Sequence, residues 1–266
     1  VGNYTITAQG TTTADITAKP ITVSGITAAN KTYDGDTSVT IDVSAATFTG
    51  LVAGDDVTVS ATGVFSDKNV DTGKTITLTE TNGGDDVGNY TITAQGTTTA
   101  DITAKALTAT ITAQDKVYDA SNQAIVSLAL SGYVGDETLV TTETTARFDN
   151  INVGERTATA TAITLGDGTG GGLASNYSLA TGQTDTANIT PALLTITAAN
   201  AAKFVTDNDP EFTVIYNGFV GSEDSSNLTT IGTVARTDAN TAAGTYEGVI
   251  APSGYAAGNY TFKYVN

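Results

Sequence analysis

The sequence predicts an all-β chain in which tandem small β-sandwich modules, Ig-like or β-grasp-like, are arranged end to end as an elongated rod. Composition is the first reason, because Thr, Val, Ile and Tyr favour strands while Gly, Asn and Asp favour turns. Alternation of apolar and polar residues is the second reason, and internal repetition is the third. The length of 266 residues leaves room for two or three domains of about 100 to 150 residues each.

Period-two alternation places the individual strands. Tyr90 and Ile92 fall on one side of a strand, and Thr91 and Thr93 fall on the other. The pattern continues over residues 100–112 and crosses a module boundary without a Gly or a polar linker, so consecutive modules are joined by a nearly continuous extended segment. Further strands, separated by Gly, Asn and Asp turns, are expected at residues 38–43, 56–61, 74–79, 124–130, 157–165, 212–216 and 246–250.

Internal repetition sets the domain organisation. The string VGNYTITAQGTTTADITAK occurs at residues 1–19 and again, letter for letter, at residues 87–105. Strand packing constrains only alternate positions, so identity at every position indicates recent duplication. Diverged copies of the string occupy residues 175–191 and begin again at Gly258. The predicted domains are therefore 1–19 (the C-terminal strands of a preceding repeat), 20–105, 106–191 and 192–266.

Residues 1–19 are expected to lie inside a module, which makes the chain a slice of a longer array. Strands without their partners expose unpaired backbone groups. We therefore predict that this segment pairs either with the first full module or with another copy of the chain.

Composition excludes several classes of function. The net charge is −17, and the clustered Lys and Arg that bind phosphates are missing, so nucleic acid is not an expected partner. The chain contains no His, Cys, Met or Trp, which excludes Ser-His-Asp and Cys-His catalysis, His/Cys zinc sites, haem ligation and disulfides. Without a long apolar run or a charged leader followed by one, neither a membrane span nor a signal peptide is expected in this segment.

Further motifs recur between the repeated endings. The stretch Lys31-Thr-Tyr-Asp-Gly35 matches Lys116-Val-Tyr-Asp-Ala120. A Gly-[Leu/Tyr/Phe]-Val turn recurs in residues 48–55, 130–136 and 216–221, and an Asn-Val stretch recurs in residues 65–70 and 148–153, with a looser match at 236–241.

These motifs, together with the Asn-Tyr-Thr…Ala-Asp-Ile-Thr ending, resemble the YDG repeat of very large bacterial surface proteins. The last module is similar to the related MBG domain, and the likeness covers nearly the whole chain. It weakens where Ala120 replaces the Gly and where the stretch after Lys203 lacks the Tyr. The resemblance implies secreted or surface-displayed stalk domains of filamentous-haemagglutinin-like adhesins, and it supplies no catalytic residues.

Three acidic turns could offer carboxylates to Ca²⁺, which takes six to eight oxygen ligands. None has the spacing of an EF-hand loop, and Asp-Gly is also an ordinary hairpin turn, so the turn interpretation is favoured. No metal ligand is assigned, no cofactor is required, and Ca²⁺ is left open. Tyr33 and Tyr118 are interpreted as core or rim aromatics that anchor a turn, in preference to ligand-stacking residues. The acidic turns are Tyr33-Asp34-Gly35-Asp36, Gly54-Asp55-Asp56 and Gly84-Asp85-Asp86.

Other motifs carry even less chemistry. A glycosidase needs two carboxyls about 5 to 10 Å apart, but the sequence neighbours in residues 55–56 and 85–86 diverge, so no catalytic residue is assigned and the protein is expected not to be an enzyme. The Thr rows at 91–93 and 97–99 suit an ice- or glycan-facing surface, yet ordinary exposed strands look the same. The Gly-rich stretch 168–172 lacks a Lys-Ser/Thr and a following helix, so it is interpreted as a hairpin loop and not a phosphate cradle.

Two functions from different classes follow. The first is a non-catalytic structural stalk segment of an extracellular bacterial adhesin, which projects a binding region from the cell surface. Arrays gain reach by adding modules, a Cys-free chain refolds after export without reshuffling disulfides, and an acidic surface stays soluble. The second is a carbohydrate-binding module of an adhesin, with Ca²⁺ dependence left open. Neighbouring repeats of the same chain are the expected partners, and a host or matrix glycan or protein is also left open.

Overall fold

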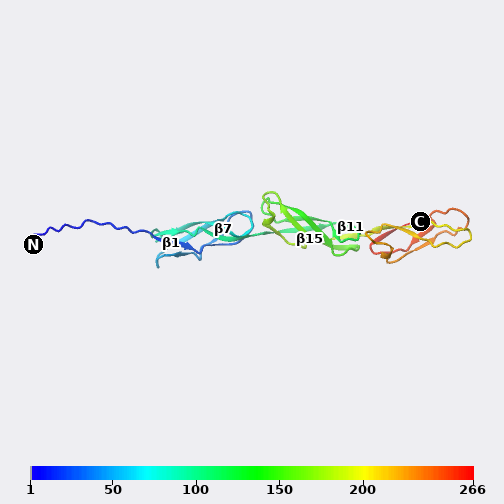
Figure 1. Ribbon diagram of the computed structural model, residues 1–266, viewed down its shortest axis with the longest axis horizontal. Coiled ribbons are helices and arrows are strands. Elements are labelled where there is room, and N and C mark those ends of the chain that lie inside the picture. Colours follow the sequence, from blue (N-terminus) through cyan, green and yellow to red (C-terminus); the bar gives the residue numbers. More distant parts are fainter. Residues whose placement is uncertain (1) are drawn as a thin grey trace. The chain divides into compact units, whose positions relative to one another are not determined.

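The computed structural model describes residues 2–266, apart from the side chains of residues 142 and 143. Its regular elements are strands and three single turns of 3-10 helix, which confirms the all-β class (Figure 1). The chain forms two compact units. Unit 1 contains the residues up to Lys105 together with Val134–Asp136 and Leu173–Ser178, and unit 2 contains the remainder. The first repeat (20–105) lies in unit 1 and the third (192–266) in unit 2, while the second (106–191) contributes to both.

Unit 1 is built from two mixed sheets. In the three-stranded sheet, β1 (Lys19–Ser24) pairs antiparallel with β5 (Thr47–Thr49) and parallel with β8 (Tyr90–Thr93). The four-stranded sheet has the order β3-β9-β7-β6, with β3 parallel to β9 and the other pairs antiparallel. Its strands are β3 (Lys31–Thr32), β6 (Thr58–Phe65), β7 (Asp71–Gly83) and β9 (Thr97–Thr103). Two short strands, β2 (Thr27–Ala28) and β4 (Ile41–Asp42), pair separately, and η1 (Val87–Asn89) precedes β8.

The core of unit 1 follows the alternation expected from the sequence. Ile21 and Val23 of β1 are buried, as are Ile76 of β7 and Ile102 of β9, while the Thr residues between them face solvent. Successive side chains of a strand point to opposite faces, so a β-branched residue at every second position fills one face of each sheet.

The second repeat contributes a larger sheet to unit 2, with the order β11-β17-β15-β14-β12. These strands are β11 (Lys116–Val117), β12 (Gln123–Ala124), β14 (Leu139–Phe148), β15 (Gly154–Asp167) and β17 (Thr184–Thr190). Separately, β10 (Lys105–Ala113) pairs antiparallel with β13 (Val126–Ser131). The one-turn helix η2 (Ala174–Asn176) leads into β16 (Tyr177–Leu179).

The third repeat reproduces the three-stranded scheme of the first. Here β18 (Ala192–Ala198) pairs antiparallel with β19 (Val214–Asn217) and parallel with β22 (Tyr260–Val265). A separate pair consists of β20 (Thr233–Arg236) and β21 (Ile250–Ser253), and η3 (Ser225–Asn227) is a single turn.

A hydrophobic cluster in unit 2 crosses the boundary between the second and third repeats. Only Pro191 separates β17 from β18, so the chain enters the third repeat without a flexible linker. Buried residues of both repeats then pack together into one core, so the two repeats share apolar packing. The buried members are Tyr118, Phe148, Ala158, Ala187, Ile189, Ala192, Leu194, Ile196, Tyr255 and Tyr260.

Most expected strands are present, with three differences. The strand expected at 246–250 is wrong, because a bend with Gly248 at a φ of +70° occupies that stretch and β21 begins only at Ile250. The expected ranges also leave out several strands, including β1, β5, β14, β18 and β20. Residues 2–18 contain no strand, so within the described chain they do not form the pairing expected of a preceding repeat's ending. Pairing with another repeat or copy stays a prediction.

Candidate functional site at the repeat junctions

A turn that follows β3 is held in shape by Lys31. Its Nζ lies 2.7 Å from Asp34 Oδ1 and 2.8 Å from Asp36 Oδ1. Asp34 Oδ1 also accepts the backbone N–H of Asp36 at 3.2 Å, and Gly35 has a φ of +87°, which favours glycine. The Lys31 ammonium lies 5.7 Å from the centroid of the Phe65 ring. One ammonium therefore binds both carboxylates, and all three groups hold the turn.

The second repeat builds the same turn after β11. Lys116 Nζ lies 2.7 Å from Asp119 Oδ1, and that oxygen accepts the backbone N–H of Ser121 at 2.9 Å. Lys116 also lies 5.9 Å from the ring centroid of Phe148, and Ala120 takes the glycine position with a φ of +59°. We call these two structures the Tyr-Asp turns, after Tyr33-Asp34 and Tyr118-Asp119.

In unit 1, the Tyr-Asp turn is covered by residues of the second repeat. Tyr33 is 1% exposed, and its backbone N–H donates to Thr103 O at 2.8 Å. Its ring meets the ring of Tyr177 edge to face, with centroids 5.5 Å apart and planes at 78°. Such pairs contribute about 0.5 to 1.5 kcal/mol beyond the area they bury. The Tyr of one repeat is thus buried by a Tyr of the next.

Asn176 adds two directional hydrogen bonds to this junction. Its Oδ1 accepts the backbone N–H of Val70 at 2.9 Å, and its Nδ2 donates to Asn69 Oδ1 at 3.0 Å. The loop that carries Asn69 is fixed by Asp67, whose Oδ1 accepts the Asn69 N–H and the Lys74 ammonium, both at 2.8 Å. Asn176 is fully buried. Removing its amide would leave its two half-buried partners unsatisfied.

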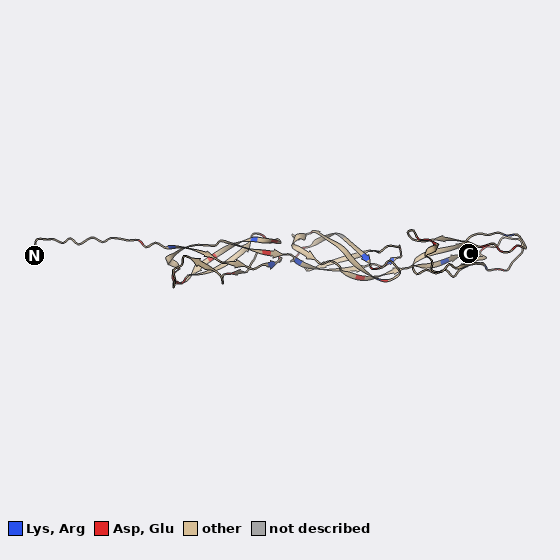
Figure 2. Cartoon of the chain, turned by 60° about the horizontal axis from the view of Figure 1, so that its bottom comes forward, with Lys and Arg blue, Asp and Glu red and all other residues tan. Residues whose placement is uncertain are grey.

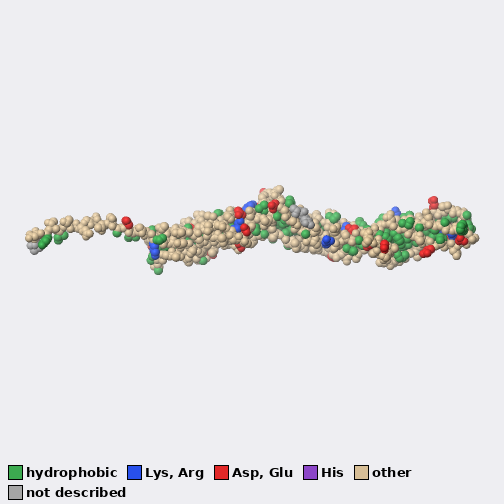
Figure 3. Space-filling view, viewed as in Figure 1, with side chains coloured by type: hydrophobic (Ala, Val, Ile, Leu, Met, Phe, Trp, Pro, Cys, Tyr) green, Lys and Arg blue, Asp and Glu red, His purple; other side chains and the backbone are tan. Residues whose placement is uncertain are grey.

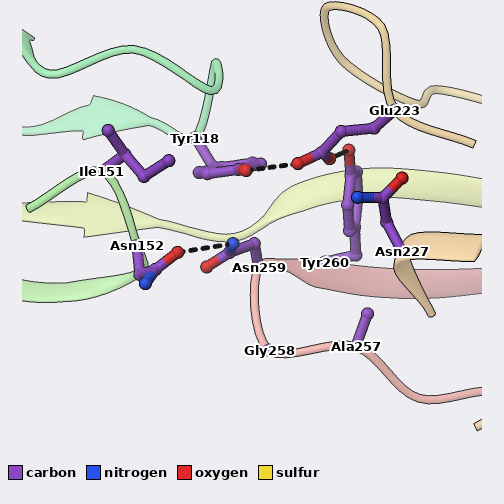
Figure 4. Close-up of a pocket in the computed structure, with 9 residues that line it drawn as sticks. All are labelled: Tyr118, Ile151, Asn152, Glu223, Asn227, Ala257, Gly258, Asn259 and Tyr260. Atoms are coloured by element: carbon purple, nitrogen blue, oxygen red, sulfur yellow. Dashed lines mark hydrogen bonds between the residues drawn. The ribbon is translucent and has the colours of Figure 1, made fainter. Parts of the chain in front are cut away.

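Unit 2 contains the same junction between the second and third repeats (Figure 4). Asn259 Oδ1 accepts the backbone N–H of Val153 at 3.0 Å, and Asn259 Nδ2 donates to Asn152 Oδ1 at 3.0 Å. The rings of Tyr118 and Tyr260 meet edge to face, 5.8 Å apart at 79°.

Each junction therefore consists of three parts. The Tyr-Asp turn and an Asn-Val loop come from one repeat, and an Asn-Tyr pair comes from the next. The Asn-Val loops are Asn69-Val70 and Asn152-Val153, and the Asn-Tyr pairs are Asn176-Tyr177 and Asn259-Tyr260.

Glu223 strengthens the junction in unit 2. Its Oε1 accepts the Tyr118 hydroxyl at 2.6 Å, and its Oε2 accepts the Tyr260 hydroxyl. Burial raises the pKa of Tyr118, and the bond to Glu223 raises it further. Burial and the same carboxylate raise the pKa of Tyr260 to about 12. Both phenols therefore stay protonated as donors, and one carboxylate joins the two repeats.

Comparisons with known proteins match this organisation. A family model of the YDG domain matches residues 17–100 and 103–187, and a model of the MBG domain (YGX type) matches residues 194–266. The chain belongs to the YDG domain family. The matched segments begin within three residues of the repeat starts at 20, 106 and 192 that the sequence suggests. No curated protein and no solved structure matches the chain.

The other acidic turns of the first YDG repeat close loops as well. Asp55 accepts the Tyr90 hydroxyl at 2.5 Å, which raises the pKa of Tyr90. The Asp56 N–H donates to Asp86 Oδ2 at 2.8 Å, and the Asp85 N–H donates to Asp56 Oδ2 at 3.2 Å. These bonds support the turn interpretation, and Ca²⁺ binding stays an open prediction. Figure 2 marks where Asp and Glu occur along the chain. Among the side chains that the structure describes, no three acidic ones are grouped so as to hold a metal ion.

An open hollow of about 260 Å³ lies at the junction of the second YDG repeat with the MBG domain. Figure 4 shows Glu223 bonded to Tyr118 and Tyr260, and Asn152 bonded to Asn259. Asn227 also lines the hollow. A second hollow, of about 400 Å³, lies beside the first Tyr-Asp turn and is lined mainly by polar side chains, including Lys31 and Asp34. In the first hollow the side chains of the junction thus satisfy one another.

The remaining motifs lie on surface elements. Thr91 and Thr93 of β8 and Thr97 and Thr99 of β9 are exposed, as ordinary strand faces are. The Gly-rich stretch 168–172 connects β15 to η2, so its interpretation as a hairpin loop is wrong. Glycine is needed there for packing, because a Cβ on Gly168 would lie 2.1 Å from a backbone oxygen.

The sequence interpretation found one half of each junction and missed the other. Tyr33 and Tyr118 are buried, as expected for anchoring aromatics. Asn176, Asn259 and Glu223 were not singled out. The signal for them was present, since Asn-Tyr recurs in every copy of the repeated ending, and strand packing alone gives no reason to keep an exposed Asn before the Tyr.

Proposed function

We propose that this chain is a non-catalytic structural stalk segment of an extracellular bacterial adhesin, which holds a binding region away from the cell surface. One observation supports this above the others: the same side-chain junction forms twice, between different pairs of repeats. Adhesin stalks need such a joint, because reach is gained only when each added repeat keeps its direction relative to the last.

The chemistry of the junction suits that role. Two hydrogen bonds from one amide fix a direction, and an edge-to-face ring pair fixes a second contact point, so rotation about the connecting strand breaks both. Pro191 adds stiffness at the second junction by restricting φ to about −65°. The partners we propose are accordingly the neighbouring repeats of the same chain.

Composition supports export and display. A chain with a net charge of −17 repels its neighbours on a crowded surface. Among the residues that the structure describes, no helix is long and apolar enough to cross a membrane. We infer an extracellular location, with any anchor or binding region carried by other parts of the parent protein.

Small-angle scattering tests the stalk. A compact globule of 266 residues has a radius of gyration of about 18 Å. Three repeats in line, each about 35 to 40 Å long, give more than about 30 Å. A value near 20 Å would contradict the proposal. The double variant Asn176→Ala, Asn259→Ala should broaden the distance distribution, whereas Asn3→Ala, on an exposed residue, should not.

A glycan array with and without EDTA separates the stalk from a carbohydrate-binding module. A stalk segment should bind no glycan under either condition. EDTA-sensitive binding of one sugar class would favour the module.

A further inference from the structure

The first repeat carries its own Asn-Tyr pair, Asn89-Tyr90, in the same local structure as Asn176-Tyr177. The Tyr90 N–H closes η1 on Val87 O, as the Tyr177 N–H closes η2 on Ala174 O. The two tyrosines have nearly equal backbone angles, with φ and ψ of −127° and 148° against −126° and 153°.

The hydroxyls of these tyrosines also bind alike. The hydroxyl of Tyr90 accepts the N–H of Val52 at 3.2 Å, and that of Tyr177 accepts the N–H of Val134 at 3.0 Å. The half of a junction that receives a preceding repeat is therefore already formed in the first repeat.

The side chain of Asn89 differs from its counterpart only in what it contacts. Asn176 is fully buried by the loop of another repeat, whereas Asn89 is exposed. Within residues 2–266, the side-chain amide of Asn89 forms no hydrogen bond, although its backbone N–H donates to Asp86 O at 3.0 Å. Asp55 occupies the position of Glu223, because it lies three residues after Val52 as Glu223 lies three residues after Val220. Asp55 Oδ2 accepts the Tyr90 hydroxyl. In Glu223 the second oxygen binds the Tyr of the preceding repeat.

Residues 2–18 contain a second feature of a junction, the backbone acceptor for a Tyr-Asp turn, next to the Asn89-Tyr90 end of the first repeat. Thr103 O accepts the Tyr33 N–H, and Thr190 O accepts the Tyr118 N–H, each at 2.8 Å. Thr190 lies two residues before Ala192, which pairs with Tyr260 of the Asn-Tyr pair.

The same spacing occurs at the start of the chain. Thr17, the counterpart of Thr103, lies two residues before Lys19, which pairs with Tyr90. The chain therefore positions the acceptor for a further Tyr-Asp turn beside the Asn89-Tyr90 pair.

Exposed apolar side chains on this segment show what it lacks. Ile16 is 102% exposed and Tyr4 is 94% exposed, while their identical counterparts Ile102 and Tyr90 are 1% and 8% exposed. Figure 3 shows hydrophobic side chains along the N-terminal segment. These residues have the sequence of buried strands without the sheet that would bury them.

We infer that the end of the first repeat formed by Asn89, Tyr90 and Asp55 docks a further YDG repeat with the sequence of residues 20–105, through that repeat's Tyr-Asp turn and Asn-Val loop. The inference rests on the proposed stalk function and names the partner of this end. The repeated string decides the occupant, since residues 1–19 are the ending of such a repeat. A second copy of this chain fits less well, because its Tyr33 and Tyr118 are already buried in its own junctions.

The test extends the chain by joining residues 20–86 ahead of Val1. Residues 1–19 then complete a repeat identical to 20–105, and every other residue is unchanged. The first readout is hydrogen exchange at the added repeat's amide that corresponds to Val70, which Asn89 should protect. Asn89→Ala should speed that exchange about tenfold or more and lower the melting temperature of the extended chain by about 4 to 8 °C.

Matched comparisons make the result specific. Asn89→Ala should leave the melting temperature of the original 266-residue chain unchanged. Asn3→Ala should leave the melting temperature of both chains unchanged. In the extended chain Asn3 is the counterpart of Asn89 in the added repeat, and no repeat precedes that one. Equal effects of Asn89→Ala on both chains, or no effect on the extended one, would overturn the inference while leaving the scattering and glycan tests of the stalk intact. A concentration-dependent dimer of the original chain that Asn89→Ala abolishes would show that a second copy is the occupant and would also overturn it.

Discussion

The junctions in units 1 and 2 share their hydrogen bonds and differ in how tightly they pack. At Gly35, an added Cβ would lie 2.7 Å from Val134 Cγ1, closer than real Cβ contacts allow. In unit 2 the corresponding position already carries a Cβ, that of Ala120, at a φ of +59°. The amide that clamps the loop follows the same trend, since Asn176 is fully buried and Asn259 only partly.

This comparison separates what specifies a junction from what tightens it. The Asn amide and the Tyr pair are retained in both, so they determine which surfaces meet. The packing around the Tyr-Asp turn varies. In unit 2, Glu223 binds tyrosines from both repeats.

The largest expected effect comes from removing the buried ring. Tyr33→Ala and Tyr118→Ala should each cost about 3 to 5 kcal/mol, because each deletes a fully buried aromatic side chain. Tyr118→Ala also leaves a Glu223 oxygen without its donor. Denaturant unfolding monitored by circular dichroism measures both. Tyr4→Ala is the control, and a loss there as large as at Tyr33 would contradict the assignment of the junctions.

The amides give the next effect. Asn176→Ala should cost about 2 to 3 kcal/mol, because it strands the Val70 N–H and the Asn69 side chain in a fully buried site. Asn259→Ala should cost about 1 kcal/mol, since water can reach the groups it leaves. Hydrogen exchange of the Val70 and Val153 amides reports each loss locally. Equal losses at the two sites would contradict the difference in packing.

The fold was largely readable from the sequence, because period-two alternation and exact repeats report directly on strands and modules. Strand β14 escaped because its run of Thr residues, with few large apolar ones, gives weak alternation. The stretch 246–250 was misassigned because its apolar residues contact a loop, where the Tyr246 hydroxyl donates to Ala242 O.

The junctions were only half readable. A buried Tyr beside a turn looks alike whether its own repeat or a neighbour buries it, so Tyr33 was placed in a core but its partner Tyr177 was not identified. Asn69 and Asn176 are 107 residues apart, and no local pattern links positions at that separation. The repeated ending does not reveal the junction either. Its Asn is exposed at Asn3 and Asn89 and buried at Asn176, although the local sequence is alike.

Steric fit should give a smaller effect than the amide at the first junction. Gly35→Ala is expected to cost about 2 kcal/mol, since it combines a positive φ with the 2.7 Å contact to Val134. Gly221→Ala has a φ of +60° but no clash, so it should cost about 1 kcal/mol. Melting temperatures of the two variants decide the point. If Gly221→Ala proves the worse, the contact to Val134 does not limit the fit at Gly35.

The smallest effect is the response of stability to pH. It should be absent near neutral pH and appear only in strongly alkaline solution. The pKa values of Tyr118 and Tyr260 are raised by burial and by Glu223, the latter to about 12, above the usual value of about 10 for an unfolded Tyr. A raised phenol pKa means that the folded state holds its proton more tightly. The stabilisation is therefore complete below pH 10 and is lost as the pH rises from about 10 through about 12.

Thermal melts between pH 9 and pH 12 measure this slope. The double variant Tyr118→Phe, Tyr260→Phe should start less stable and lose less on alkalinisation, because neither ring can ionise beside the carboxylate. The melting temperature of this variant should still fall somewhat with pH, since the pKa of Tyr255 in the same unit is also raised to about 12, chiefly by burial. Tyr246→Phe, whose hydroxyl binds only a backbone oxygen in a loop, is the matched control. An unchanged slope in the double variant would show that the Glu223 bridge does not couple the two repeats.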